Sequence, residues 1–133
     1  DVHLAGHSDG DAAAHAITDA VLGAVGAGDI GEMFSDRDQQ NKNRDSIEML
    51  RLAVARVATM GWRVQQVDVV IVAEKPKISS HRELMRARLA GALGVAPESV
   101  SVKGKTNEGM GWIGRGEGIA CIAVATVESI APG

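Results

Sequence analysis

The chain has 133 residues, 45% of them hydrophobic, and a formal net charge of −3 at pH 7. This length fits one domain with a modest core, and the slightly acidic balance argues against nucleic acid as a main partner. No apolar run is long enough to cross a bilayer, and the start, DVHLAGHSDG, lacks the basic and apolar regions of a signal peptide. The single cysteine, Cys121, is typical of a cytoplasmic protein, or of a plastid protein that has lost its transit peptide.

The hydrophobic residues of this chain are mostly small. Aromatic residues make up 2% of the sequence, so the core must be built mainly from aliphatic side chains. Small side chains bury little area each, and burial stabilises a fold by roughly 25 cal/mol per Å². We therefore expect the domain to gain stability by oligomerisation.

The first part of the chain predicts a helix followed by a polar loop. Residues 10–27 are rich in alanine, and Gly28 is a plausible stop. The apolar face of this helix is predicted to consist of Ala13, Ile17, Ala20 and Ala24. The opposite polar face carries Asp11, His15 and Asp19. Residues 29–45 have no apolar period, and their aspartates suit a lid over a charged ligand.

Two further helices are predicted from their caps and apolar stripes. Asp45 or Ser46 begins a helix that ends near Met60. Ser80 and Glu83 have the spacing of a capping box at the start of another helix. That helix is predicted to run through Leu84, Met85, Leu89, Ala92 and Leu93, with Gly94 as the stop.

Three apolar stretches predict strands, at Val67–Ala73, Val100–Lys103 and Ile119–Val127. The first and the last are apolar on both faces, so both faces must be covered. Helices can cover one face, and a neighbouring subunit would suit the other.

Asp1, His3 and His15 form the strongest metal candidate. Asp1 and His3 point the same way if their segment is extended, and His15 adds a second imidazole. Two imidazoles and one carboxylate leave a coordination position open, as in catalytic zinc sites. Asp11 and Asp19 could orient the imidazole of His15. The alternative is that these residues lie on a solvated surface, and spacing alone leaves both readings open.

Two further segments suit phosphate. His7 and Ser8 precede the predicted helix, whose free N–H groups attract anions, although Ser8 or Asp9 could equally be a plain N-cap. Residues 103–118 combine lysines, a threonine and a glutamate with a glycine-rich turn that is not a P-loop. Within this stretch Thr106 could donate to a phosphoryl oxygen, and Glu108 could bind Mg²⁺, unless both are merely solvated.

Taken together, these segments closely resemble the family of 2-C-methyl-D-erythritol 2,4-cyclodiphosphate synthases, from Asp1 to about Glu128. The resemblance rests on the order and spacing of DVH, HSDGD followed by HAITDA, GDIG, DS, AEKPKI and GRGEGIA.

The resemblance implies one α/β (α+β) domain over residues 1–133, with a four-stranded mixed sheet packed on helices. It also implies a homotrimer with active sites at the subunit interfaces and an apolar central cavity, where an isoprenoid diphosphate could bind. Two elements of the family pattern are missing: the N-terminal strand ahead of Asp1, and a hairpin-length segment between His3 and Leu4.

The resemblance also assigns roles to individual residues. It implies one Zn²⁺ per subunit on Asp1, His3 and His15, and Mg²⁺ or Mn²⁺ on Glu108. His7 and Thr106 are the implied catalytic residues. The implied substrate-binding residues are His7, Ser8, Asp29, Ile30, Gly31, Phe34, Asp36, Asp38, Ala73, Lys77, Ile78, Ser79, Lys105, Thr106, Asn107, Glu108, Trp112 and Arg115.

The implied reaction is an intramolecular phosphoryl transfer in non-mevalonate isoprenoid biosynthesis. The 2-phosphate of 4-diphosphocytidyl-2-C-methyl-D-erythritol 2-phosphate attacks the β-phosphorus of its own diphosphate and releases CMP. Two alternatives are a zinc phosphohydrolase, in which the open metal position activates water, and a trimeric protein that binds an isoprenoid diphosphate with Arg115 at the mouth of the cavity.

Overall fold

The computed structural model describes residues 2–35, 45–73, 81–105 and 119–130, with side chains described from Asp9 onward. The elements in chain order are α1 (Val2–Ala24), α2 (Ile30–Met33), α3 (Ser46–Thr59), β1 (Trp62–Val72), α4 (Arg82–Leu93), a 3₁₀ turn η3 (Pro97–Ser99), β2 (Val100–Lys105) and β3 (Ala120–Ser129). Helix and strand types agree with the predictions, and α2 lies in a segment that was predicted to be a loop.

The strands form one mixed sheet in the order β2-β1-β3. The central strand, β1, runs parallel to β2 and antiparallel to β3. The described residues contain three strands, so the implied fourth strand is not found among them. The residues from Val2 onward are helical instead. In this chain Leu4 directly follows His3, without the hairpin-length segment of the family pattern. Helix α1 therefore continues through this stretch without interruption.

Strand β1 begins five residues before its predicted start. Its first residues, Trp62–Gln66, carry polar side chains that hide the strand signal. They nevertheless pair with β3, from Trp62 opposite Ser129 onward, with a register shift between Val64 and Gln66. Pairing with a long neighbour therefore extends the strand beyond its apolar stretch.

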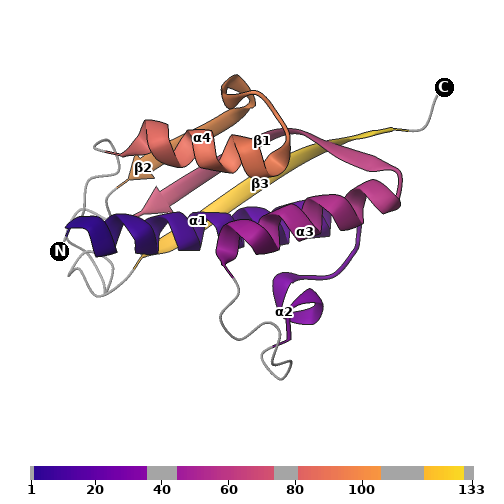
Figure 1. The fold of residues 1–133 in the computed structure, drawn as a ribbon, viewed down its shortest axis with the longest axis horizontal. Helices are drawn as coiled ribbons and strands as arrows, with labels where there is room; N and C mark the ends of the chain where they lie inside the picture. The colour runs from indigo at the N-terminus through magenta and orange to yellow at the C-terminus, as the bar shows by residue number, and fades with distance from the viewer. Residues whose placement is uncertain (1, 36–44, 74–80, 106–118, 131–133) are drawn as a thin grey trace.

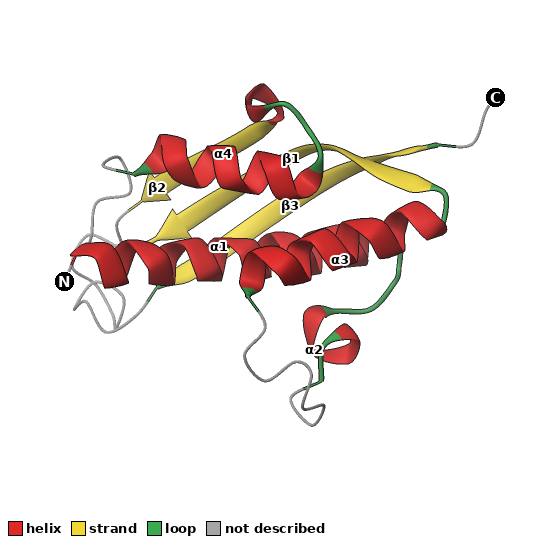
Figure 2. Cartoon of the chain, viewed as in Figure 1, coloured by secondary structure: helices red, strands yellow, loops and turns green. Residues whose placement is uncertain are grey.

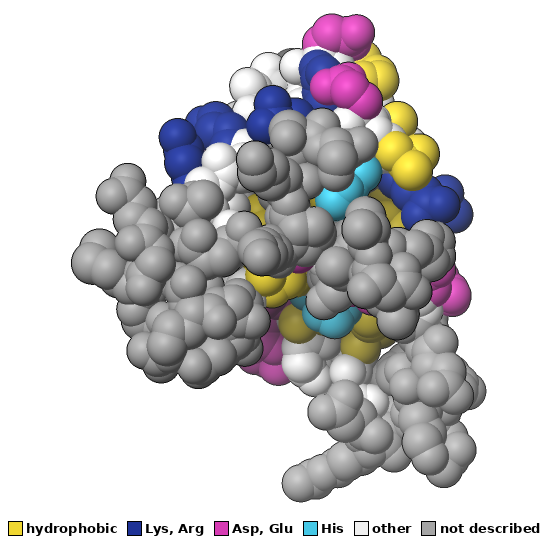
Figure 3. Space-filling model, turned by 90° about the vertical axis from the view of Figure 1, so that its left-hand side faces the viewer, with side chains coloured by type: hydrophobic (Ala, Val, Ile, Leu, Met, Phe, Trp, Pro, Cys, Tyr) yellow, Lys and Arg dark blue, Asp and Glu magenta, His cyan; other side chains and the backbone are white. Residues whose placement is uncertain are grey.

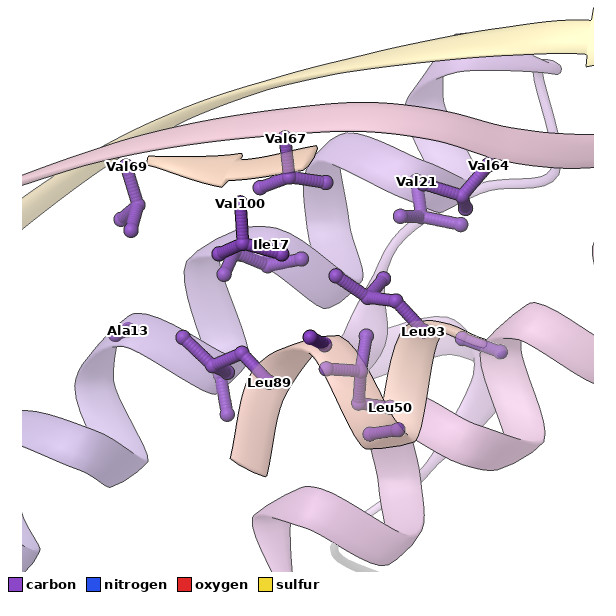
Figure 4. Packing of buried hydrophobic residues seen from close by; sticks show 14 of the residues in the cluster. Ala13, Ile17, Val21, Leu50, Val64, Val67, Val69, Leu89, Leu93 and Val100 are labelled. Carbon is purple, nitrogen blue, oxygen red and sulfur yellow. The ribbon is translucent and has the colours of Figure 1, made fainter. Parts of the chain in front are cut away.

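The molecule has two layers, because α1, α3 and α4 all lie on one face of the sheet (Figures 1 and 2). The core fills the space between these layers. Figure 4 shows side chains of α1, α3 and α4 converging with Val67 and Val69 of β1 and Val100 of β2. The two layers are thus held together by aliphatic contacts, as the composition predicts.

Helix α1 buries a broader face than predicted. Ala13 and Ile17 are fully buried, but Ala20 is only half-buried and Ala24 is exposed. The buried face consists of Ala13, Ala14, Ile17, Thr18, Val21 and Leu22. The face is broad because the helix packs against both the sheet and α3. The Thr18 hydroxyl within it donates to the Ala14 carbonyl at 2.8 Å, which satisfies this buried polar group.

The ends of the helices test the cap predictions. Asp45 caps α3, accepting a hydrogen bond from the Ile47 amide at 2.7 Å, and Gly94 ends α4 with a φ of +73°. Asp45 is thus the cap of the two candidates, Asp45 and Ser46, and the prediction for Gly94 is confirmed. The Ser80–Glu83 capping box is wrong, because α4 has His81 as its N-cap, without a side-chain cap bond. Glu83 instead pairs with Arg86 at 3.3 Å, one turn along the helix.

Leu84 lies within α4, as predicted, and is 61% exposed. Burial on α4 falls on Met85, Leu89, Ala90, Ala92 and Leu93.

Among the described residues, no element covers the second face of the sheet, which we call the uncovered face. Ile122 and Val124 of β3 are 67% and 63% exposed, whereas Val67 and Val69 on the other face of β1 are fully buried. This agrees with the prediction that the last strand is apolar on both faces. No helix in the described part of the chain has the length and hydropathy needed to span a membrane.

Candidate functional site

The predicted substrate-binding segments attach at one end of the sheet. Val72 at the end of β1 lies beside Lys105 at the end of β2 and beside Ala120 at the start of β3. The Ala73 amide donates to the Lys105 carbonyl at 3.0 Å, which continues the pairing by one residue. Helices α1 and α4 begin at the same end (Figure 1). Residues 74–80, between β1 and α4, and residues 106–118, between β2 and β3, therefore both attach at this end of the sheet.

Only part of the predicted site falls within the described residues. Ala73 is buried and Lys105 is exposed. His3, His7 and Ser8 are described only as helical backbone. The predicted residues outside the description are Asp1, Asp36, Asp38, Lys77, Ile78, Ser79, Thr106, Asn107, Glu108, Trp112 and Arg115.

The backbone of α1 does not support the extended segment that was predicted around His3. His3 and His15 belong to the same helix and are twelve residues apart. At a rise of 1.5 Å per residue they lie about 18 Å apart along its axis. Zinc ligands lie about 2 Å from the ion, so these two imidazoles cannot share one ion across this distance. Within the described part of the chain, no three acidic, histidine or cysteine side chains are grouped so as to hold a metal. In this conformation the predicted residues do not fit zinc.

His15 is exposed on α1, between two aspartates that anchor other segments. One turn after it, Asp19 Oδ1 accepts a hydrogen bond from the Ile30 amide at 2.6 Å. One turn before it, Asp11 Oδ1 accepts from the Ser46 hydroxyl at 2.5 Å. Both carboxylates were predicted to orient the imidazole of His15. Their described bonds fasten the starts of α2 and α3 to α1, and the orienting role stays a prediction.

Helix α2 presents the predicted Asp29–Gly31 segment on this same surface. Asp29 caps the helix, accepting from the Glu32 amide at 2.8 Å. Gly28, before the cap, has a φ of +94°, which favours glycine. Asp29 and Gly31 are exposed, whereas Phe34 is buried. Burial of Phe34 and the hydrogen bond from the Ile30 amide to Asp19 of α1 thus fix the segment, and Asp29 faces solvent.

Lys103 has a different role from that suggested by its position in the cationic stretch. Its Nζ lies 2.9 Å from Asp68 Oδ2, on the uncovered face of the sheet. Lys105, two residues later, is exposed at the end where the predicted site lies.

A buried polar cluster that no sequence pattern indicated lies at this end of the sheet. Asp9 is 1% exposed, and its Oδ2 lies 4.0 Å from Nε2 of His81. Burial raises the pKa of Asp9, and the nearby His81 partly opposes this shift. Burial, together with the charge of Asp9, raises the pKa of the Cys121 thiol to about 11. Asp9 had been considered only as an N-cap, but α1 begins at Val2 and places it inside the helix.

Figure 3 views the molecule from this end, where histidine side chains reach the surface among acidic and hydrophobic neighbours. Lys105 is exposed at this end of the sheet, whereas His15 and the start of α2 lie further along α1.

Comparison with known proteins identifies related chains. The model of the YgbB family matches residues 1–128. A 2-C-methyl-D-erythritol 2,4-cyclodiphosphate synthase of Gemmatimonas aurantiaca is 59% identical over 130 residues, which are 98% of this chain and 78% of that protein.

Solved structures with the same fold include single-function and bifunctional proteins. The bifunctional IspDF of Campylobacter jejuni is 38% identical with a TM-score of 0.85; the match covers 92% of this chain and 33% of that one. A CDP complex of IspF from Plasmodium falciparum is 34% identical with a TM-score of 0.73, over 86% of this chain and 67% of that one.

Proposed function

The chain belongs to the YgbB family, that of the 2-C-methyl-D-erythritol 2,4-cyclodiphosphate synthases, and we propose that it catalyses their cyclisation in isoprenoid biosynthesis. Its substrate would be 4-diphosphocytidyl-2-C-methyl-D-erythritol 2-phosphate. The observation that carries the proposal is the meeting of Val72, Lys105 and Ala120 at one sheet end, since both predicted nucleotide-binding segments attach there.

The proposed reaction is a displacement within one molecule. An oxygen of the 2-phosphate forms a bond to the β-phosphorus, and the bond from that phosphorus to the oxygen bridging it to the α-phosphate breaks. CMP leaves with the electron pair of the broken bond, and the cyclic diphosphate remains. The phosphate nucleophile is already ionised at neutral pH, so no strong base is needed. The protein's main task is to fold the substrate so that the two groups meet in line.

The described residues suit three parts of this task. Asp29, exposed at the start of α2, is placed to accept hydrogen bonds from sugar-like hydroxyls. Lys105, exposed at the end of β2, offers a positive charge to the diphosphate. Ala73, whose amide donates to the Lys105 carbonyl, lies at the same sheet end, and the resemblance assigns it to the cytosine pocket. The CDP complex of the Plasmodium falciparum relative is consistent with a cytidine nucleotide as ligand.

Titration with CDP tests the nucleotide part of the proposal. We expect wild-type protein to bind CDP, and Lys105→Ala to weaken binding about tenfold, the scale of one charge-assisted contact. Arg51→Ala removes the same charge from an exposed position on α3 and should leave the affinity unchanged. Isothermal titration calorimetry measures all three. Equal affinities for the wild type and Lys105→Ala would contradict the assignment of Lys105.

We also propose that the uncovered sheet face forms the inner wall of a homotrimer. Ile122 and Val124 form an exposed apolar surface on β3, bordered by the Asp68–Lys103 ion pair. Neighbouring large apolar side chains left this exposed are typical of an interaction surface. A trimer would place the active sites at the subunit interfaces, where the sheet end of one subunit, with Ala73 and Lys105, meets the next subunit. An isoprenoid diphosphate in the enclosed cavity is a further part of the proposal, with Arg115 outside the described residues.

We propose that zinc binding requires a change in the conformation of α1. Asp1, His3 and His15 are the donor types of a catalytic zinc site, but the helix holds His3 and His15 too far apart. We therefore expect zinc to bind only when the residues before His7 leave the helix. The magnesium or manganese proposed at Glu108 rests on the family resemblance. A cytoplasmic location is likewise proposed, on the single cysteine.

Zinc titration followed by far-UV circular dichroism checks this condition. One equivalent of zinc should bind with a loss of helical signal, and His15→Ala should show neither binding nor the loss. Binding with unchanged helicity, or no binding by the wild type, would contradict the assigned ligands.

A further inference from the structure

Asp9 is a carboxyl group buried inside helix α1. Its side chain is 2% exposed, and its Oδ2 atom has no hydrogen-bond partner among the described residues. The Nε2 atom of His81, the N-cap of α4, lies 4.0 Å from this oxygen, and the His81 side chain is 20% exposed. A buried carboxylate is costly unless a positive charge or a hydrogen bond compensates it. The charge states of these two groups therefore affect the contact between α1 and α4.

The pair joins two helices that otherwise meet mainly through a third. Helix α1 packs mainly on β3 and α3, whereas α4 packs mainly on α3 and β2. Asp9 and His81 link α1 and α4 directly, at the end where both helices begin (Figure 1). The His81 carbonyl also accepts a hydrogen bond from the Met85 amide at 3.1 Å, which closes the first turn of α4. The same residue thus contacts Asp9 and holds this turn.

Two elements bring titratable groups to Asp9 in the described part of the chain. On β3 the group is the Cys121 thiol, whose pKa is raised to about 11 by burial and by the charge of Asp9, so it stays neutral at physiological pH. On α4 it is His81, which is the only charged group that shifts the pKa of Asp9. His81 is followed by Arg82, whose buried Nε has no hydrogen-bond partner among the described residues.

The other charged side chains of the elements that pack on α1 are engaged elsewhere or exposed. On α1 itself, Asp11 accepts a hydrogen bond from α3. Asp68 of β1 pairs with Lys103 on the uncovered face of the sheet. The charged residues of α2, of the cap of α3 and of α3 itself are exposed: Glu32, Asp45, Glu48, Arg51 and Arg56. Between neutral and mildly acidic pH, the charge in this cluster therefore changes at Asp9 and His81.

The sign of the pH dependence follows from the burial of Asp9. Burial raises the pKa of its carboxyl, and the charge of His81 partly opposes this shift. The folded protein therefore keeps a proton on Asp9 at pH values where the unfolded chain has lost it. This contribution to stability is fully present below the pKa of the unfolded chain, and it is lost as the pH rises through the pKa of the folded state. Imidazoles in general lose their charge between about pH 5 and pH 8, which removes the compensating charge in the same direction.

We propose that Asp9 and His81 form a pH-sensitive clamp between α1 and the first turn of α4. At acidic pH the carboxyl is protonated or faces a charged imidazole, and the two helices are held together. As the pH rises, the ionised carboxylate is left beside a neutral ring, and the first turn of α4 opens more often. The inference does not depend on the proposed function, because no ligand takes part in it.

Hydrogen exchange at the Met85 amide measures the opening of this turn. Its protection factor, which corrects for the pH dependence of the intrinsic exchange rate, should fall about tenfold in the wild type between about pH 5 and pH 8. A tenfold fall is the scale of one charge-assisted contact. In Asp9→Asn, which keeps the shape of the side chain but carries no charge, the protection factor should not change with pH. Glu83→Gln is the matched control, since it removes an 80% exposed carboxylate from the same turn, and it should behave like the wild type.

The titration of Asp9 itself provides a second readout, through the NMR chemical shift of its carboxyl carbon. In His81→Gln the pKa of Asp9 should rise, because the charge that opposes the effect of burial is gone. A thermal melt of each variant identifies any that do not fold. If Asp9→Asn is one of them, the titration in His81→Gln decides the question.

Three results would overturn the clamp. The first is a Met85 protection factor in the wild type that is the same at both pH values. The second is a fall in Asp9→Asn as large as that in the wild type. The third is an Asp9 pKa that is unchanged in His81→Gln, which would show that the two side chains are not coupled.

Discussion

Replacing Val124 with lysine is expected to convert the trimer into monomers. Val124 is 63% exposed in the single chain and lies beside Ile122 on the uncovered face of β3. At a threefold interface the substitution would bury three ammonium groups close together, and burying an unpaired charge costs several kcal/mol. The association constant should therefore fall by at least a hundredfold. Turnover should fall with it, since each proposed active site draws on two subunits.

Leu84→Lys is the matched control for this variant. Leu84 is 61% exposed, so this substitution also places a lysine at a position of similar exposure, but on α4 in the other layer. Sedimentation velocity at several concentrations measures the assembly of both. We expect Leu84→Lys to remain trimeric. A wild-type monomer, or a Val124→Lys trimer as stable as the wild type, would contradict the proposed interface.

Replacing Thr106 with alanine is expected to lower kcat by about 10²–10³, the effect of removing one preorganised donor to a charged transition state. Thr106 directly follows Lys105, the last residue of β2, and itself lies outside the described residues. The proposed role of its hydroxyl is to donate to a phosphoryl oxygen as charge shifts during the displacement. Such a bond strengthens in the transition state, so kcat should respond more than KM.

Thr106→Ser keeps the hydroxyl and removes only a methyl group, and it should retain most of the activity. Steady-state release of CMP measures both variants. If Thr106→Ala raised only KM, the residue would be a binding group; if its kcat equalled that of the wild type, the catalytic role would be wrong.

The sequence was sufficient to predict helix ends where a single residue determines the end. Gly94 was assigned correctly, and the start of α3 was narrowed to Asp45 or Ser46, because a cap depends on a left-handed backbone or on a side chain at one position. The apolar stretches of β1, β2 and β3 were likewise found. The start of β1 was missed because pairing with β3, and not local composition, makes Trp62–Gln66 a strand.

The roles of the aspartates on α1 could not be predicted from spacing. Asp11, His15 and Asp19 do share a helical face, as predicted. Their partners, Ser46 and Ile30, come from later segments, so only the tertiary fold reveals the bonds. Asp9 has no distinctive signal either, because its partner His81 is far along the chain.

The extent of α1 explains the main disagreement at the site. The sequence motif suggested an extended Asp1-Val2-His3 segment, whereas the helix runs from Val2 through His15. A continuous helix separates the two histidines in proportion to the residues between them. The zinc prediction therefore depends on a conformational change, and the cyclisation proposal depends on the sheet end and the family membership.

The most direct test of the proposed function is ³¹P NMR of the purified protein with 4-diphosphocytidyl-2-C-methyl-D-erythritol 2-phosphate, Zn²⁺ and Mg²⁺. The account predicts that CMP appears together with a cyclic diphosphate whose two phosphorus nuclei are coupled to each other. CMP accompanied by a linear phosphorylated product would indicate a hydrolase and contradict the cyclisation. An unchanged substrate spectrum would contradict catalysis by this chain altogether.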